Sequence, residues 1–300
     1  MIYDVIIIGR GPAGLSAGIY ASRFKMKNLI IGQDAGNLAL APIVENWPGL
    51  ESVPGPQLLD KIKAQALKYG SEIIEDQVTE VTKTDHFLVK TEKQTYESQT
   101  LIVAMGTQHR KLNVPGEAQF QGMGVTYCAT CDAPLYKDKV VAVVGGGDSA
   151  AKTALLLAKY AQKIYVLVRD KTMIAEPQNL ENLKKQPKVE IKYDISLQEI
   201  KGDSSVKQII TTQGPIEVNG IFVAIGQVPS DEALKNLGLK MDKDGYILVN
   251  DDFSTNIAGV FAAGDIATNE IGKNFRQSVV AAGQGAVATN SAYNYLRSLK

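Results

Sequence analysis

The sequence predicts an α/β protein in which one strand, turn and helix unit occurs twice. The first copy has an apolar strand at 5–8 and a glycine-rich turn at 9–14, followed by a helix of small and apolar residues. The second copy has a strand at 140–144, a glycine turn at 145–150 and a helix at 151–160. Continuous apolar strands are typical of parallel sheets that are covered on both faces. We therefore expect two parallel sheets with helices packed on them.

Each glycine turn has the spacing that lets a backbone approach a pyrophosphate. The segment Gly9 to Gly14 reads G-x-G-x-x-G between a strand and a helix, and a helix N-terminus favours negative charge. A strand at 28–31 ends just before Asp34, where an acidic residue would bond ribose hydroxyls. The interval from Gly145 to Asp170 equals that from Gly9 to Asp34. The repeat predicts two Rossmann-like dinucleotide-binding domains.

The composition excludes several classes of partner. The chain has 300 residues, 45% of them hydrophobic, and 32 basic residues balance 32 acidic ones. No global field therefore favours nucleic acid or an anionic membrane, and the length suggests about two domains. No apolar run approaches the roughly 18 residues that a membrane helix needs, and the N-terminus lacks the regions of a signal peptide. We expect a soluble cytoplasmic protein.

The two cysteines of the chain lie close together in the segment Cys128-Ala129-Thr130-Cys131-Asp132. Two thiols separated by two residues can close a small disulfide ring and reopen it without large backbone movement. The C-x-x-C arrangement is a common way to favour the thiolate that exchange requires. Asp132 follows directly and is placed to carry the proton that each exchange step moves. We predict that Cys128, Cys131 and Asp132 are catalytic.

Two structural roles for the cysteines are less favoured. A disulfide that closes a two-residue loop removes little entropy from the unfolded chain and would stabilise it little. A structural zinc site needs four ligands, and the histidines, His86 and His109, have no ligand spacing to the cysteines or to each other. The sequence therefore favours a redox pair and predicts no metal.

The segments between the two glycine turns show weaker patterns. The passage 42–56 is polar and rich in proline, and a helical spacing of apolar residues follows at 57–69. Short strands are expected within 73–103 and within 189–210. A last helix, 277–295, carries the small residues Ala281, Ala282, Gly283 and Gly285. These residues permit close contact either with a flat ligand or with a neighbouring element, and the sequence does not decide between the two.

Turn chemistry suggests where the chain crosses between domains. Asn113 to Gly116 forms one candidate boundary, and Asp244-Gly245 forms the second. The predicted division is a first domain made of residues 1–113 and 245–300, interrupted by a second domain at 114–244 that carries the cysteine pair.

Six segments, in this order, resemble the low-molecular-weight thioredoxin reductases, which are FAD-dependent pyridine nucleotide-disulfide oxidoreductases. These segments are Gly9–Gly14, Glu45–Gly49, Cys128–Asp132, Gly145–Ala150, Gly259–Asp265 and Arg276-Gln277. The resemblance implies a homodimer in which a discontinuous FAD domain is interrupted by a pyridine-nucleotide domain that rotates. It implies that electrons pass from a donor through FAD to the Cys128–Cys131 pair and then to thioredoxin or a thioredoxin-like protein.

The resemblance also implies roles for individual residues. Cys131 would be the thiol nearest the flavin, Cys128 the thiol that attacks thioredoxin, and Asp132 the general acid. Together with the glycine motifs, it predicts two sets of cofactor-binding residues. The FAD set is Gly9, Gly11, Pro12, Ala13, Gly14, Asp34, Asn37, Leu38, Asn46, Gly106, Gly264, Asp265, Arg276, Gln277 and Ser278, and the nucleotide set is Gly145, Gly147, Asp148, Ser149, Ala150, Arg169 and Asp170.

The most important departure of the chain from the family concerns the electron donor. The family's basic cluster, which grips the 2′-phosphate of NADPH, aligns with Val168, Arg169, Asp170 and Ile174, leaving one Arg of three. Asp170 lies where an acidic residue bonds the ribose 2′-hydroxyl of NAD. We predict that NADPH is a poor donor and that NADH is equal or better. Two alternatives stay open: a reductase that takes electrons from ferredoxin, and a flavin-dependent dithiol oxidase that uses oxygen as acceptor.

Overall fold

A computed structural model describes residues 2–33, 36–41, 44–229, 232–269 and 276–299, with Leu40 and Cys131 described by their backbone alone. The chain forms two compact units. Unit 1 contains residues 1–108 and 228–300, and unit 2 contains residues 109–227. Unit 1 is therefore discontinuous in sequence, and unit 2 carries both cysteines.

Unit 1 is built on a seven-stranded sheet of order β3-β2-β1-β6-β5-β4, with β18 beside β6. The pairs of β1 with β2 and β6, of β2 with β3, and of β6 with β18 are parallel, whereas β4, β5 and β6 form an antiparallel meander. The strands are β1 (Ile2–Ile8), β2 (Asn28–Ile31), β3 (Glu72–Ile74), β4 (Val78–Lys83), β5 (Phe87–Thr91), β6 (Thr95–Val103) and β18 (Val260–Ala262).

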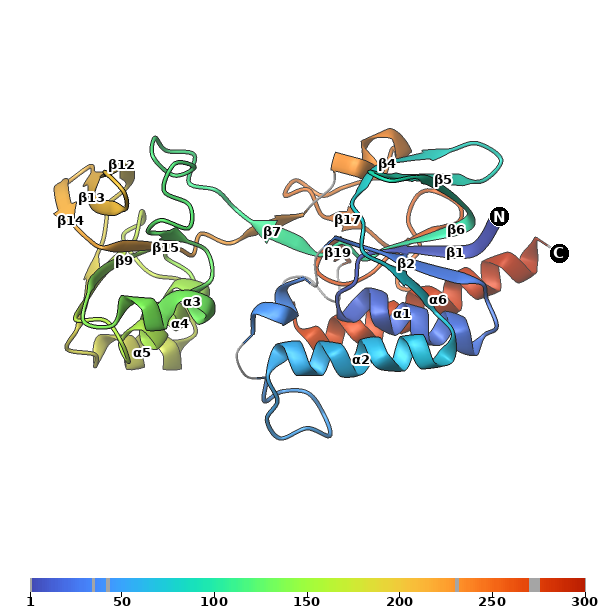
Figure 1. Ribbon diagram of the computed structural model, residues 1–300, viewed down its shortest axis with the longest axis horizontal. Helices are drawn as coiled ribbons and strands as arrows, with labels where there is room; N and C mark the ends of the chain where they lie inside the picture. Colours follow the sequence, from blue (N-terminus) through green and yellow to red (C-terminus); the bar gives the residue numbers. More distant parts are fainter. Residues whose placement is uncertain (1, 34–35, 42–43, 230–231, 270–275, 300) are drawn as a thin grey trace. The chain divides into compact units, whose positions relative to one another are not determined.

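Three helices cover one face of the parallel part of this sheet: α1 (Pro12–Arg23), α2 (Gly55–Tyr69) and α6 (Ser278–Ser298) (Figure 1). Their apolar residues form one core with Val5, Ile7 and Ile102 of the sheet. A second core lies on the opposite face, where β4 and β5 pack with η3 (Glu232–Leu237) and β17 (Ile247–Leu248). β17 pairs with β19 (Ala267–Thr268).

The small residues of α6 allow it to approach α1 closely. A Cβ on Gly285 would lie 2.1 Å from the carbonyl oxygen of Ala13 in α1. One α6 turn later, the Thr289 hydroxyl donates to the carbonyl oxygen of Gly285 at 2.8 Å, and its oxygen also lies 3.2 Å from the carbonyl oxygen of Ala17 in α1. Helix packing therefore accounts for Gly285, whereas a Cβ on Gly283 would meet nothing within 4 Å among the described residues.

Unit 2 contains a five-stranded parallel sheet of order β11-β10-β9-β15-β8 and a three-stranded antiparallel sheet of order β12-β13-β14. The three helices α3, α4 and α5 lie together on one side of the parallel sheet (Figure 1), and the antiparallel sheet shares a core with its other face. The elements are β8 (Val125–Thr126), α3 (Ala129–Asp132), η2 (Ala133–Tyr136), β9 (Val140–Val144), α4 (Asp148–Leu157), β10 (Lys163–Leu167), α5 (Pro177–Lys184), β11 (Val189–Lys192), β12 (Leu197–Gly202), β13 (Val206–Thr211), β14 (Gly214–Glu217) and β15 (Gly220–Val223).

The crossings between the units differ from the boundaries expected from turn chemistry. They occur at 108/109 and 227/228, within β7 (Thr107–His109) and β16 (Gln227–Pro229), which pair with each other. The first lies close to the expected position at 113/114. The second lies well before Asp244-Gly245, because Leu234 and Ile247 on either side of that turn are buried in a unit 1 core. A glycine turn marks a reversal of the chain, and burial decides to which unit the flanking residues belong.

The helices that the structure describes include none that is both long and apolar enough to cross a membrane.

Candidate active site

The first glycine loop is packed on one side and open on the other. Gly9, with a φ of +122°, has no room for a Cβ, which would lie 2.1 Å from the carbonyl oxygen of Ala104. A Cβ on Gly14 would lie 1.9 Å from the carbonyl oxygen of Gly9. Gly11 begins α1 without a side-chain cap, and a Cβ there would meet no described atom within 4 Å. The loop therefore fits a pyrophosphate that approaches at Gly11, with Pro12 and Ala13 in the first turn of the helix.

Residues from opposite ends of the chain meet in unit 1. The Asn46 Nδ2 donates to Oε1 of Gln277 at 2.9 Å. A Cβ on Gly264 would lie 3.0 Å from the Cβ of Ala13, so the segment after β18 reaches the start of α1. These contacts bring together residues that the resemblance predicts along one flavin.

Asp265 is largely withdrawn from solvent. Burial raises the pKa of its carboxyl above the ordinary value, and the positive charge of Arg276 opposes this shift. The Arg276 guanidinium lies 4.0 Å from the centre of the Tyr246 ring, and this contact holds the cation in place. A partly buried carboxyl under the influence of a cation is suited to a flavin that carries hydroxyl and imide groups.

The remaining residues of the predicted FAD set differ from one another in their surroundings. Asn37 donates from Nδ2 to the Oγ1 of Thr107 at 3.4 Å. Gly106 has a φ of +66° with no described atom near its Cβ position, and Ser278 is the first residue of α6. Leu38 is buried in the helix-side core, which assigns its side chain to packing. Asp34 lies outside the described residues.

Arg10, inside the first glycine loop, was not predicted to be functional. Its Nη1 pairs with the Glu75 carboxylate at 3.0 Å, and its Nη2 donates to the carbonyl oxygen of Gln33 at 2.9 Å. Its Nε is buried without a partner among the described residues. A buried donor beside a phosphate-binding loop suits an anionic ligand. An Arg between two loop glycines is the sequence signal that could have identified it.

The segment 128–132, called the redox turn below, is held by the hydroxyl of Thr126. Cys128 is disulfide-bonded, and the other cysteine of the chain, Cys131, lies in α3. The Cys128 N–H donates to Oγ1 of Thr126 at 3.1 Å, and that hydroxyl donates to Oδ2 of Asp132. The Asp132 N–H donates to the carbonyl oxygen of Cys128 at 3.1 Å. The structure therefore brings the predicted Cys128 and Asp132 together, and it adds Thr126, which the sequence prediction does not include.

A buried carboxylate connects this turn to the start of unit 2. Glu117 is 4% exposed and accepts hydrogen bonds from the N–H groups of Leu112 and Asn113, both at 2.7 Å. It also accepts the hydroxyl of Tyr127, whose pKa is raised by burial and by this hydrogen bond. Tyr127 directly precedes Cys128. Glu117 therefore fixes the entering chain to the redox turn, and no motif in the sequence singled it out.

The second glycine loop repeats the construction of the first. A Cβ on Gly145 would lie 2.2 Å from the carbonyl oxygen of Ala224, as one on Gly9 meets Ala104. Gly147 begins α4 without a side-chain cap, and Asp148 and Ser149 occupy the first turn. Ala150 stands where the first loop has Gly14, and it is fully buried. The loop has the backbone form of a dinucleotide site.

The segment after β10 is anchored to this loop. The Ile174 N–H donates to the carbonyl oxygen of Gly146 at 2.7 Å. Asp148 accepts the Glu176 N–H at 3.1 Å and the Asn179 amide at 2.8 Å, and it pairs with Lys152 at 2.7 Å. Burial alone would raise the pKa of Asp148, but these donors outweigh burial and lower it. Asp148 is therefore an ionised anchor.

The position that corresponds to the family's basic cluster carries little positive charge. Arg169 and Asp170 are 82% and 66% exposed in their side chains, and Nε of the Arg lies 3.8 Å from Oδ1 of the Asp. Ile174 is 83% exposed. The single guanidinium is thus partly neutralised by its neighbour, and the third aligned position is an exposed apolar side chain.

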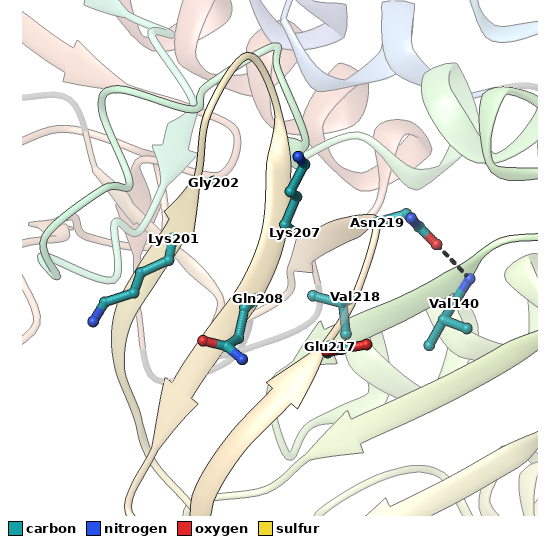
Figure 2. Close-up of a pocket in the computed structure, with 8 residues that line it drawn as sticks. All are labelled: Val140, Lys201, Gly202, Lys207, Gln208, Glu217, Val218 and Asn219. Carbon is teal, nitrogen blue, oxygen red and sulfur yellow. Dashed lines mark hydrogen bonds between the residues drawn. The ribbon is translucent and has the colours of Figure 1, made fainter.

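A surface hollow of about 660 Å³ lies on the antiparallel sheet of unit 2 (Figure 2). Its two lysines, Lys201 and Lys207, are already paired with Glu199 at 3.1 Å and Asp203 at 2.5 Å. The Val140 N–H at its edge donates to Oδ1 of Asn219 at 3.0 Å. The described residues that line it belong neither to a glycine loop nor to the redox turn, so we assign it no part in the reaction.

Comparisons with known proteins agree with this geometry. The sequence matches the family described as pyridine nucleotide-disulphide oxidoreductase over residues 3–286. A thioredoxin reductase from Listeria innocua is 38% identical over 309 residues, which cover 100% of this chain and 95% of that protein.

Solved structures give the same result. The thioredoxin reductase of Lactococcus lactis has a TM-score of 0.91 at 34% identity, covering 99% of each chain. A ferredoxin-flavin thioredoxin reductase from Clostridium acetobutylicum has a TM-score of 0.54 at 34% identity, covering 99% of this chain and 98% of that one. The relatives favour disulfide reduction over the dithiol oxidase alternative. The fold prediction is confirmed, and the chain belongs to the pyridine nucleotide-disulphide oxidoreductase family, as an FAD-dependent thioredoxin reductase.

Proposed function

We propose that this thioredoxin reductase works through Cys128, Cys131 and Asp132, and that NADPH is a poor electron donor for it. Bound FAD supplies the two-electron chemistry that links donor and disulfide. Residues of unit 1 would hold that group: Gly11 and the start of α1 would bind its pyrophosphate, and Asn46, Asp265 and Gln277 would contact the flavin.

The Cys128–Cys131 pair carries the electrons to the protein substrate. The Cys128 thiolate attacks one sulfur of the thioredoxin disulfide, that S–S bond breaks, and the departing thiolate takes a proton from Asp132. The Cys131 thiol then passes its proton to Asp132 as its sulfur attacks Cys128. The pair closes as a disulfide, the mixed disulfide breaks, and the second thioredoxin thiolate takes that proton from Asp132. In sum, the pair loses two electrons and two protons, and thioredoxin gains both.

The donor proposal depends on the pairing of Arg169 with Asp170. A 2′-phosphate carries about two negative charges and is best held by several Arg side chains, each contributing about 1.5–3 kcal/mol through charge-assisted bonds. One partly neutralised Arg beside a carboxylate supplies little of this binding free energy. The same carboxylate suits a free ribose 2′-hydroxyl. We therefore expect NADH to serve at least as well as NADPH.

Ferredoxin is the second candidate donor. It is supported by the likeness to the ferredoxin-flavin thioredoxin reductase of Clostridium acetobutylicum, which is as similar in sequence as the Lactococcus lactis enzyme. In this case the second glycine loop would be retained as a scaffold for the redox turn.

Anaerobic reduction of the flavin decides between the donors. The purified protein with bound FAD is mixed with NADH, NADPH or reduced ferredoxin, and the loss of flavin absorbance is followed. We expect NADH to give a catalytic efficiency equal to or above that of NADPH. If both nucleotides reduce the flavin only weakly, we expect reduced ferredoxin to reduce it rapidly. A much higher efficiency with NADPH would contradict the proposal.

Restoring the basic cluster should change the donor preference. We expect the double substitution Asp170→Arg with Ile174→Arg to raise kcat/KM for NADPH by about tenfold or more relative to NADH, since it adds two phosphate-binding groups and removes a repulsive carboxylate. Asp203→Arg with Ser204→Arg, on the exposed turn between β12 and β13, makes the same change in net charge and serves as the control. Equal gains in the two variants would show that only the overall charge matters.

The assembly and location complete the proposal. On the resemblance to the family, the chain forms a homodimer, works in the cytoplasm, and binds neither nucleic acid nor a membrane. The discontinuous unit 1 serves as the FAD domain, and unit 2 serves as the pyridine-nucleotide domain with the dithiol.

A further inference from the structure

Thr126 is the last residue of β8, at the edge of the parallel sheet in unit 2. It pairs with Phe222 of β15 in the sheet register, and it is only 7% exposed. The backbone that carries this hydroxyl is therefore held by the sheet, whereas Cys128 and Asp132 lie in the short turn that follows. A fixed group next to a short turn can determine where the side chains of the turn point.

The hydrogen bonds of this hydroxyl have a defined direction. A threonine hydroxyl has one proton to donate and lone pairs to accept with. The Thr126 oxygen accepts the Cys128 N–H at 3.1 Å, and its proton is donated to Oδ2 of Asp132. Because Oδ2 accepts this hydrogen bond, a proton that the Asp132 carboxyl carries during exchange is expected on Oδ1. One hydroxyl thus fixes both the cysteine backbone and the acid.

We propose that Thr126 is a positioning residue, whose hydroxyl holds the Asp132 carboxyl in place so that Oδ1 delivers its proton to the thiolate that leaves in each exchange step. This inference rests on the proposed role of Asp132 as the general acid. No redox step is added: the electrons and protons balance as in the exchange between the dithiol and thioredoxin described above.

One further titratable side chain interacts with the charge of Asp132. Tyr136, in η2, is a titratable side chain that senses the charge of Asp132. Its pKa is raised by burial and, to a smaller extent, by that charge, so it stays neutral where the reductase is assayed. Tyr136 therefore adds no charge beside the Asp132 carboxyl under assay conditions.

The test is the rate at which oxidised thioredoxin reoxidises the reduced enzyme with FAD bound, measured in a single turnover. Thr126→Val keeps the branched shape and removes the hydroxyl, and Thr126→Ser keeps the hydroxyl. We expect the Val variant to lose about tenfold in rate with little change in the half-saturating thioredoxin concentration, and the Ser variant to recover most of the loss.

A double-mutant cycle with Asp132→Asn separates positioning from structural damage. If Thr126 acts through Asp132, Thr126→Val should cause no further loss in a protein that already carries Asp132→Asn. An equal tenfold loss in both backgrounds would overturn the proposal, since it would mean that the hydroxyl only supports the Cys128 backbone. If Asp132→Asn is slow while Thr126→Val keeps the wild-type rate, the role of Asp132 stands and only the proposed role of Thr126 is wrong. If Asp132→Asn keeps the full rate, the proposed acid fails and Thr126 with it.

Discussion

Replacing Cys128 with Ser is expected to abolish thioredoxin reduction, by about a thousandfold or more, while flavin remains bound. The substitution removes the thiolate that attacks the thioredoxin disulfide, and an alcohol at neutral pH cannot replace it. The remaining thiol, Cys131, can no longer form a disulfide within the chain. If Cys131 is the thiol nearest the flavin, this variant should show a long-wavelength absorbance band from contact of its thiolate with FAD.

The matched variant is Cys131→Ser, which should also be inactive but should lack the band. The two proteins differ only in which sulfur is left, so their spectra assign the two roles directly. Appearance of the band in the Cys131→Ser protein instead would reverse the assignment. Thr130→Ser, within the same α3 turn, controls for small changes of side chain at this place.

A methyl group on Gly14 is expected to prevent unit 1 from holding FAD. The added Cβ would lie 1.9 Å from the carbonyl oxygen of Gly9, a backbone atom that cannot move without opening the first glycine loop. Gly14→Ala is therefore expected to lower the free energy of unfolding by about 3 kcal/mol or more and to yield protein without flavin. Thermal unfolding and the ratio of flavin to protein absorbance measure the two effects.

Gly11→Ala separates folding from cofactor binding in the same loop. None of the described atoms lies within 4 Å of the Cβ it would add, and Gly11 has an ordinary extended backbone as the N-cap of α1. We expect this variant to unfold at the normal temperature when FAD is absent and yet to bind FAD more weakly. Normal FAD affinity in Gly11→Ala would show that the pyrophosphate does not approach at this face.

Strong local patterns predicted the strands that lead into or out of the glycine loops. The strands at 28–31 and 140–144 occur with the predicted bounds as β2 and β9, because a short apolar run that ends in a glycine turn admits few other structures. The close packing at Gly9 and Gly145 repeats in the two units for the same reason. The open choice for the last helix is resolved only in part: Gly285 packs on Ala13, and Gly283 has no described neighbour at its Cβ position.

The sequence could not supply the contacts that depend on residues far apart or on a polar side chain of ordinary type. The second crossing between units was misplaced because the burial of Leu234 and Ile247 depends on strands much earlier in the chain. Thr126 and Glu117 were not predicted as site residues, because a Thr and a Glu occur in many surface positions. Only the fold shows which hydrogen bonds they make.

Electrons are expected to pass between the flavin and the Cys128–Cys131 pair of one chain. An anaerobic reductive titration of the purified protein tests this directly, because FAD and a disulfide each accept about two electrons. We predict an uptake of about four electrons per chain, about two in Cys128→Ser, and full reoxidation of the wild-type flavin on adding oxidised thioredoxin. Uptake of only about two electrons by the wild-type protein, with a flavin that thioredoxin cannot reoxidise, would contradict this electron path.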